Sequence, residues 1–217
     1  MKLVYSLLAV GVLGLSSAFY VNMKPVHADN AIITNTKPIA VSNTHGYKVD
    51  VENSIVGWVG SKPTGKHSGT LKLNSGALHA DNGLVASGNF ILNMSSINCT
   101  DLSGKGKESL EGHLKSADFF GIEKNPTATF DITEVKALEV KPEGLINTDA
   151  THTIAGNLTL LGISKGVSFP AQVIMADGKI AVKASFNIDR TEWGMTYGAE
   201  GKVAKEINLT LDLKASN

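Results

Sequence analysis

The sequence predicts an all-β fold, an antiparallel barrel or sandwich with one helical insertion. Three observations support this prediction. Several short segments alternate between apolar and polar residues, as strands with one buried face do. Gly, Asn and Asp residues separate these segments, as they do in tight turns. One stretch lacks the alternation and has helical spacing instead.

The N-terminus has the pattern of a secretory signal peptide, which we predict over residues 1–28. Lys2 precedes an uncharged, mostly apolar run, and small residues form two candidate cleavage sites that end at Ala18 and Ala28. The alternative is an uncleaved N-terminal anchor, because Leu3–Val21 has 19 residues, close to the ~20 that cross a bilayer. We therefore expect a periplasmic or secreted protein.

The alternating pattern begins at Gly46, and the predicted domain covers residues 46–217. Residues 29–45 are rich in Asn and Thr without a sustained period, so we expect them to form a linker. The 217 residues of the chain suit one domain with a short appendage.

The strands are predicted from their apolar faces. Five faces are well defined: Tyr47, Val49 and Val51; Leu84, Ala86, Phe90, Leu92 and Met94; Val167, Phe169, Ala171, Val173 and Met175; Ile180, Val182, Ala184, Phe186 and Ile188; Ile207, Leu209, Leu211 and Leu213. Weaker alternation predicts strands at 54–60, 69–74, 126–135 and 152–161, about nine in all. Predicted turns include 74–76, 81–83 and 177–178. A sandwich or a closed barrel would resolve the sheet edges, and periodicity leaves both open.

Residues 101–126 break the alternation. Leu110, Leu114 and Phe119 fall near helical spacing, and Glu111 and Lys115 form an i,i+4 pair that we expect on the exposed side. The sequence therefore predicts a short helical insertion near residues 104–122.

Several function classes lack support in the sequence. The 20 basic and 20 acidic residues balance, so no nucleic-acid partner is expected. Gly60, Gly65 and Lys66 have the spacing of a phosphate-binding loop, but strands flank them and His67 replaces the Ser or Thr. We interpret this loop as a hairpin connection.

The sequence predicts no catalytic residue, no metal site and no cofactor. The six histidines form no close ligand pair, and no local nucleophile–base motif is present. The single cysteine, Cys99, cannot form an internal disulfide, and we expect a small buried side chain rather than a reactive thiol.

Four segments together resemble the YceI-like family of exported lipid- or polyisoprenoid-binding proteins. The resemblance covers residues 46–214 and depends on "WVGSKPTGKHSGTLKLNSG" (58–76), "EGHLKSADFFGIEKNPTATFDIT" (111–133), "GNLTLLGISKGVSFP" (156–170) and "FNIDRTEWGMTYG" (186–198). It implies an antiparallel, lipocalin-like β-barrel of about eight strands without catalytic machinery. It also implies an apolar interior that holds a long isoprenoid or acyl chain.

The candidate ligand-binding residues are the aromatic side chains of the predicted strands, helix and C-terminal motif. They are Trp58, Phe90, Phe119, Phe120, Phe130, Phe169, Phe186 and Trp193. The same residues would fill a sealed core, and only the resemblance favours a cavity.

The candidate headgroup residues are cationic or titratable: Lys62, Lys66, His67, His113 and Arg190. The first three share one loop, which is a solvated turn or, at a barrel mouth, a contact for an anion such as a prenyl phosphate. His113 either ties the helix to the barrel or contacts the ligand. For Arg190 we favour a structural cap that packs on an aromatic ring and pairs with a carboxylate.

The favoured hypothesis is an exported carrier or store for a long-chain isoprenoid or other lipid. Such a carrier would contact membranes transiently, and a homodimer is compatible with the sequence. The alternatives are an exported enzyme acting on a barrel-bound lipid and a ligand-free structural or stress module with a filled interior.

Overall fold

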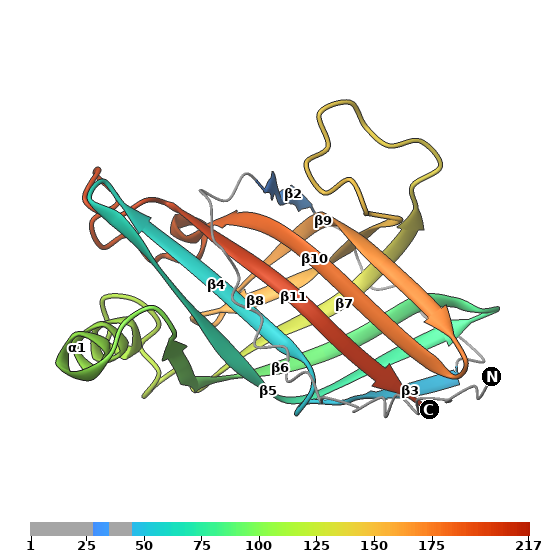
Figure 1. Ribbon diagram of the computed structural model, residues 1–217, viewed down its shortest axis with the longest axis horizontal. Helices are drawn as coiled ribbons and strands as arrows, with labels where there is room; N and C mark the ends of the chain where they lie inside the picture. The colour runs from blue at the N-terminus through green and yellow to red at the C-terminus, as the bar shows by residue number, and fades with distance from the viewer. Residues whose placement is uncertain (1–27, 35–44) are drawn as a thin grey trace, which may run out of the picture.

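Eight antiparallel strands close into a barrel in the computed structural model, which describes residues 28–34 and 45–217 (Figure 1). Each strand pairs with the next along the chain, and the last pairs with the first. The closed barrel is therefore confirmed over the sandwich. Its strands are β4 (Ile55–Lys62), β5 (Gly65–Asp81), β6 (Leu84–Cys99), β7 (Thr127–Ala137), β8 (His152–Leu160), β9 (Ile163–Ala176), β10 (Lys179–Asp189) and β11 (Glu206–Ser216).

A further strand, β3 (His45–Val49), extends the wall beyond the start of β4. It pairs with β5 on one side and β11 on the other. Tyr47 and Val49 are buried, as the alternation predicts.

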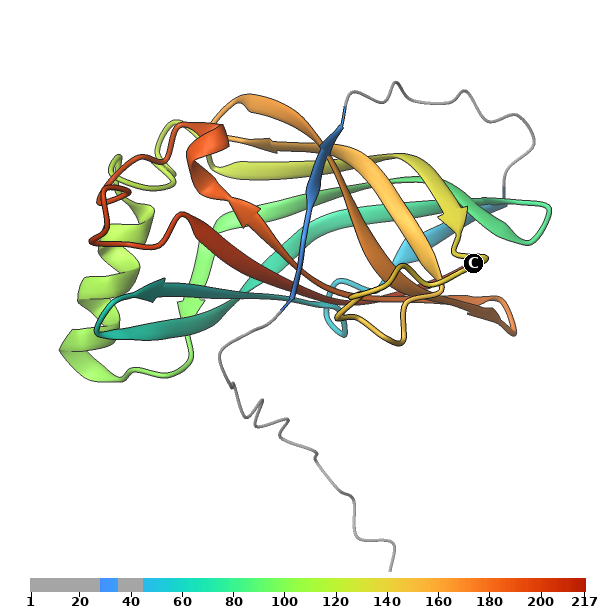
Figure 2. The ribbon, with the colours of Figure 1, turned by 90° about the horizontal axis from the view of Figure 1, so that it is seen from above.

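The predicted linker is wrong for residues 29–34, which form two short strands of the wall. β1 (Asp29–Asn30) pairs in parallel with Phe186–Asn187 of β10, and β2 (Ile32–Thr34) pairs with Gly166–Ser168 of β9. Figure 2 shows this segment, in dark blue, lying against the orange strands β9 and β10. Runs of two and three residues are too short to show a period, so alternation does not reveal them.

These two short strands fill a seam where β9 and β10 diverge. The β9–β10 ladder runs from Ala176 and Lys179 to Ala171 and Ala184, and β1 and β2 take over beyond it. A side chain at Gly166 would not fit there, because a Cβ atom would lie 2.0 Å from the Thr34 carbonyl oxygen.

The side chain of Asp29 fixes the same segment to the long loop between β7 and β8. Its carboxylate accepts hydrogen bonds from the backbone N–H groups of Ile146 (3.0 Å) and Asn147 (2.9 Å). The predicted signal peptide or anchor lies outside the described residues except for Ala28, so that assignment stays a prediction.

The inward faces of the C-terminal strands match the predicted alternation. All five predicted residues of β10 are buried, and the apolar residues of β11 line the interior. The two-residue turns at Asn82–Gly83 and Asp177–Gly178 have positive φ at both positions, as tight hairpins require.

Bulges account for two errors of the sequence prediction. β5 continues through the predicted turn at 74–76, with a register shift between Leu73 and Ser75. A second shift inserts one extra residue into β6 opposite His79 and Ala80, so that Val85 is buried and Leu84 is 62% exposed. One inserted residue reverses the inward and outward faces beyond it.

The helical insertion is confirmed as α1 (Gly104–Lys115), which ends earlier than predicted and lies across one end of the barrel (Figure 1). Glu111 does not face solvent as expected, because its Oε1 accepts a hydrogen bond from the Cys99 backbone N–H (2.8 Å). Within residues 28–34 and 45–217, no helix is long and apolar enough to cross a membrane.

Candidate functional site

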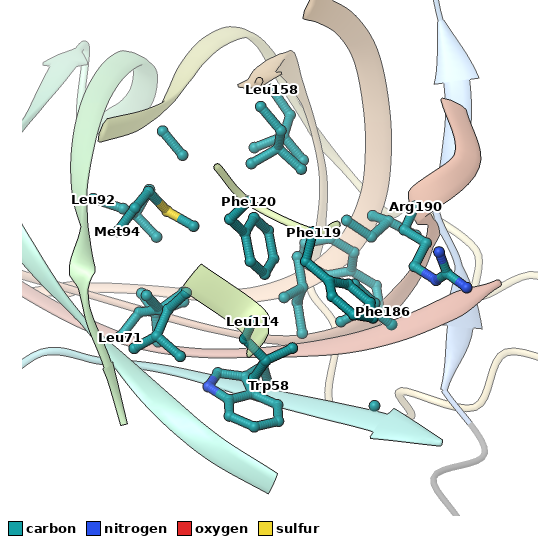
Figure 3. Close-up of a pocket in the computed structure, with 18 of the residues that line it drawn as sticks. Trp58, Leu71, Leu92, Met94, Leu114, Phe119, Phe120, Leu158, Phe186 and Arg190 are labelled. Atoms are coloured by element: carbon teal, nitrogen blue, oxygen red, sulfur yellow. The ribbon is translucent and has the colours of Figure 1, made fainter. Parts of the chain in front are cut away.

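The interior of the barrel contains an apolar cavity of about 370 Å³. This volume lies at the lower end of the range for small-molecule sites, roughly 300–1,000 Å³. All eight barrel strands contribute to the wall, and Leu114, Phe119 and Phe120 contribute from α1 and the turn that follows it (Figure 3). The interior is therefore hollow rather than filled.

Seven of the eight predicted aromatic residues line this cavity: Trp58, Phe90, Phe119, Phe120, Phe130, Phe169 and Phe186. Four of the phenylalanines form a row across the interior. Phe169 and Phe186 stack at 3.8 Å between ring centroids, and Phe130 lies 5.7 Å from Phe169 and 6.5 Å from Phe90. The row offers a continuous aromatic surface to an apolar chain.

Trp193, the eighth predicted residue, does not belong to the cavity wall. It is fully buried in the short 3₁₀-helix η1 (Arg190–Trp193), and its Nε1 donates to the Leu158 carbonyl at 3.0 Å. Its prediction as a ligand contact is therefore wrong. Aromatic character alone does not distinguish a residue that lines the cavity from one that packs behind it.

Arg190 caps the end of the barrel, and carbonyls rather than the expected carboxylate bind its guanidinium. The side chain is 1% exposed and points away from the centre of the cavity (Figure 3). Its carbon Cζ lies 5.7 Å from the centroid of Phe119. The guanidinium donates to four backbone carbonyls, those of Met195, Tyr197, Val203 and Ala204.

The hydrogen bonds of the Arg190 guanidinium fix the conformation of the loop formed by residues 195–204. Burial lowers the pKa of the guanidinium, while the nearby charges of Asp189 and Glu200 oppose that shift. An arginine keeps its charge in a protein, so the four carbonyls retain a cationic donor. The predicted role as a structural cap agrees with this geometry.

The polar residues of the lining gather at the end of the cavity that α1 partly covers. They are Ser61, Lys62 and His67 of the β4–β5 hairpin, His113 of α1, and Arg190, Tyr197 and Glu206 of the C-terminal segment. Lys66 is not among the lining residues. A strand, β5, follows the loop where a phosphate-binding loop needs a helix, so the hairpin interpretation is confirmed.

His67 is held by a carboxylate that lies 34 positions further along the chain. Its Nδ1 lies 2.9 Å from Asp101 Oδ2, and Asp101 Oδ1 accepts from the Ser68 backbone N–H (2.9 Å) and the Cys99 thiol (3.2 Å). Burial alone would raise the pKa of the Asp101 carboxyl, but the hydrogen bonds from Ser68, His67 and Cys99 bring it below its ordinary value. The pair therefore leaves Nε2 of His67 as the nitrogen available to a ligand.

The lowered pKa of Asp101 gives a pH prediction. A depressed carboxyl pKa stabilises the fold above the unfolded value of about 4, and that stability is lost as the pH falls through the folded value. Asp101→Asn should therefore reduce the free energy of unfolding at pH 7 and have a smaller effect near pH 3. Urea denaturation of both proteins across this range measures the difference, and a pH-independent loss would contradict the assignment.

His113 connects α1 to the C-terminal loop. Its Nε2 lies 3.0 Å from Asp118 Oδ2. Its ring packs edge-on against two aromatic rings, with 5.0 Å between ring centroids for Phe119 and 4.8 Å for Tyr197. The hydrogen bond to Asp118 stays within α1 and the turn that follows it, so the predicted hydrogen bond from the helix to the barrel is not observed. The ring contact with Tyr197 links α1 to the C-terminal segment instead. His113 also lines the cavity, and its contact with a ligand stays a prediction. Cys99 is a free, buried thiol, and burial raises its pKa. This environment is that of a small core side chain rather than of a reactive thiol, as the sequence analysis predicts.

A model of the YceI-like domain matches residues 47–215, most of the chain. The chain belongs to the YceI-like family. Solved structures with the same fold include BcnA of Burkholderia cenocepacia, with a TM-score of 0.62 and 20% identity over 77% of this chain and 99% of that one. A polyisoprenoid binding domain of Saccharophagus degradans, implicated in plant cell wall breakdown, has a TM-score of 0.55 and 14% identity over 78% and 97%.

Curated relatives of this YceI-like protein match over part of its length. A UPF0312 protein of Pseudomonas aeruginosa is 48% identical over 107 residues, which are 47% of this chain and 51% of the relative. Protein YceI of Salmonella arizonae is 36% identical over 105 residues, 46% of this chain and 44% of the relative. The chain thus spans about half the length of the curated relatives it matches.

Proposed function

We propose that this YceI-like protein binds a long apolar chain, an isoprenoid or an acyl lipid, inside its barrel. The observation that carries the proposal is the hollow interior of about 370 Å³, whose wall is apolar except at one end. The aromatic row contacts the chain, and the polar end holds the headgroup. The binding of polyisoprenoid by the Saccharophagus degradans domain of the same fold supports this ligand class.

The physical chemistry of transfer favours a reversible carrier or store. Burial of each CH₂ group gains about 0.8 kcal/mol relative to water, but a lipid that leaves a membrane already has that gain. Extraction is therefore close to balance, and the protein would exchange its ligand with membranes by transient contact. Export to the periplasm or the medium, which the N-terminal sequence predicts, would place it between such membranes.

Binding without catalysis accounts for the distribution of polar groups better than an enzyme does. An enzyme acting on a buried lipid would bring titratable groups together beside the chain. The titratable lining residues lie at the headgroup end, and the row of phenylalanines occupies the interior. A filled structural module would have no cavity of this size.

The test is mass spectrometry of organic extracts from gently purified protein. We expect a co-purified isoprenoid or acyl lipid, and displacement of a bound fluorescent fatty acid by a C20 polyprenol. An extract without lipid, together with no displacement, would rule out the proposed function.

Lys62, which lines the polar end of the cavity, gives a prediction about the charge of the ligand headgroup. Lys62 lines the cavity and Lys66 does not, so only Lys62 is placed to meet an anionic headgroup. Exposed ion pairs contribute up to about 1 kcal/mol, so Lys62→Ala should weaken a C20 polyprenyl phosphate about threefold and leave the C20 alcohol unchanged. Lys66→Ala is the matched control. Equal effects of the two substitutions would show that the hairpin is only a solvated turn.

A further inference from the structure

The end of the barrel opposite to α1 is filled with side chains, and the cavity stops there. β3 extends the wall at this end (Figure 1). Along β10 and β11, Val182 and Leu213 line the cavity, but the next inward residues, Ile180 and Ala215, do not. Both are buried, at 2% and 4% exposure. The cavity therefore has one closed end and one polar end that α1 partly covers.

A glycine of β6 lets two large side chains meet at the closed end. Gly88 lies in register between Leu78 of β5 and Ile132 of β7. A Cβ atom on Gly88 would lie 2.7 Å from Leu78 Cδ2 and 3.4 Å from Ile132 Cδ1. Both side chains therefore reach into the space that a larger residue at position 88 would take. Ile132 lines the cavity, and Leu78, which is 1% exposed, lies behind it.

A second glycine has the same effect on the neighbouring strand. Gly76 of β5 is in register with Phe90 of β6, and a Cβ atom on Gly76 would lie 2.9 Å from Val49 Cγ2 and 3.0 Å from Phe90 Cδ1. Phe90 lines the cavity, whereas Val49 of β3 is 2% exposed and lies behind it. We call Val49, Leu78 and Ile180 the floor layer, because they lie directly behind the residues that line the closed end.

We propose that the floor layer limits the length of the chain that the barrel accepts. This inference rests on the proposed binding of an apolar chain and specifies the ligand class. A cavity of about 150 Å³ holds benzene, with its six carbons, so about 370 Å³ holds roughly fifteen carbons. Chains of about 15–20 carbons fit with their last carbons and headgroup at the polar end. A much longer chain leaves carbons in water, and each exposed CH₂ group weakens binding about fourfold relative to a membrane.

A competition between chain lengths measures the limit. Saturated fatty acids with even chain lengths from C12 to C24 are presented together in phosphatidylcholine vesicles, and a parallel set contains C10, C15, C20 and C30 polyprenols. The protein is separated from the vesicles, and mass spectrometry gives the amount of each lipid on the protein relative to the vesicles. We expect this ratio to be nearly level up to a limiting length and to fall at least about tenfold over the next four carbons.

Substitutions at the closed end should move the limiting length in opposite directions. Leu78→Ala removes about three carbons from the floor layer and should raise the limit by about two carbons. Val182→Phe adds a ring to the lining at the same end and should lower the limit by about four carbons. Leu114→Ala is the matched control, because it makes the Leu-to-Ala change on α1 at the other end of the cavity and should leave the limit unchanged. A loss of stability would weaken all lengths alike, so it cannot imitate these shifts.

Different results separate the two proposals. If the native protein takes up none of the fatty acids and none of the polyprenols, the proposed function fails. If it takes up all lengths equally, or if the limit does not move in a folded Leu78→Ala or Val182→Phe variant, the chain is bound without a length limit from the floor layer and this inference is overturned. An equal shift in Leu114→Ala would overturn it as well.

Discussion

Replacing Ala128 by Trp is expected to abolish binding of a C20 polyprenol, with a loss of at least about a hundredfold, while the barrel stays folded. Ala128 on β7 is 2% exposed and lines the cavity. A large ring at this position projects into an interior of about 370 Å³ and takes the volume that the chain needs. The same cavity gives the ring space, so the overpacking cost should stay near 1–3 kcal/mol.

The matched control for this substitution is the preceding residue. Thr127 is exposed on the outer face of the same strand, so Thr127→Trp adds the same ring without entering the barrel. Dye displacement measures binding, and thermal unfolding verifies that both variants fold. Polyprenol binding by Ala128→Trp at native strength would mean that the chain does not occupy the barrel interior.

Arg190→Met is expected to lower the free energy of unfolding by about 3–5 kcal/mol. The substitution removes the donors of four backbone carbonyls and the cation that lies over Phe119. Methionine fills a similar volume but donates no hydrogen bond, so buried carbonyls would be left without partners. In a domain of this size the loss corresponds to a fall in melting temperature of roughly 10 °C.

Lys165→Met is the control for Arg190→Met. Lys165 pairs with Glu192 at 3.3 Å on the surface, where an ion pair contributes at most about 1 kcal/mol. Urea denaturation of both variants tests the difference between a buried cation and an exposed one. Similar stability of the two variants would contradict the assignment of Arg190 as the cap of the barrel end.

Alternation predicts the long strands well because each has one buried face over many residues. Five apolar residues recur at every second position in β10, and all five are buried. The same reasoning fails at the start of β6. It predicts Leu84 on the inner face, but one inserted residue turns Val85 inward and Leu84 outward. A bulge depends on the pairing of two strands, and neither strand's own sequence specifies it.

The candidate site also has one part that the sequence predicts and another that only the folded barrel reveals. The aromatic wall is predictable from residue type and strand face, but the hollow interior depends on how eight strands close. The Asp101–His67 pair joins residues 34 positions apart without a recognisable spacing. The role of Gly69 emerges only when the register of β4 and β5 is known, because its missing side chain leaves room for the ring of Trp58 opposite to it.

A structure of the protein with a bound C20 polyprenol tests the central claim most directly. We expect the chain to lie inside the barrel against Phe130, Phe169 and Phe186, with its oxygen at the end of the cavity that Lys62 and His67 line. A chain bound on the outer surface, with the interior unchanged, would contradict the claim that the barrel is the binding site.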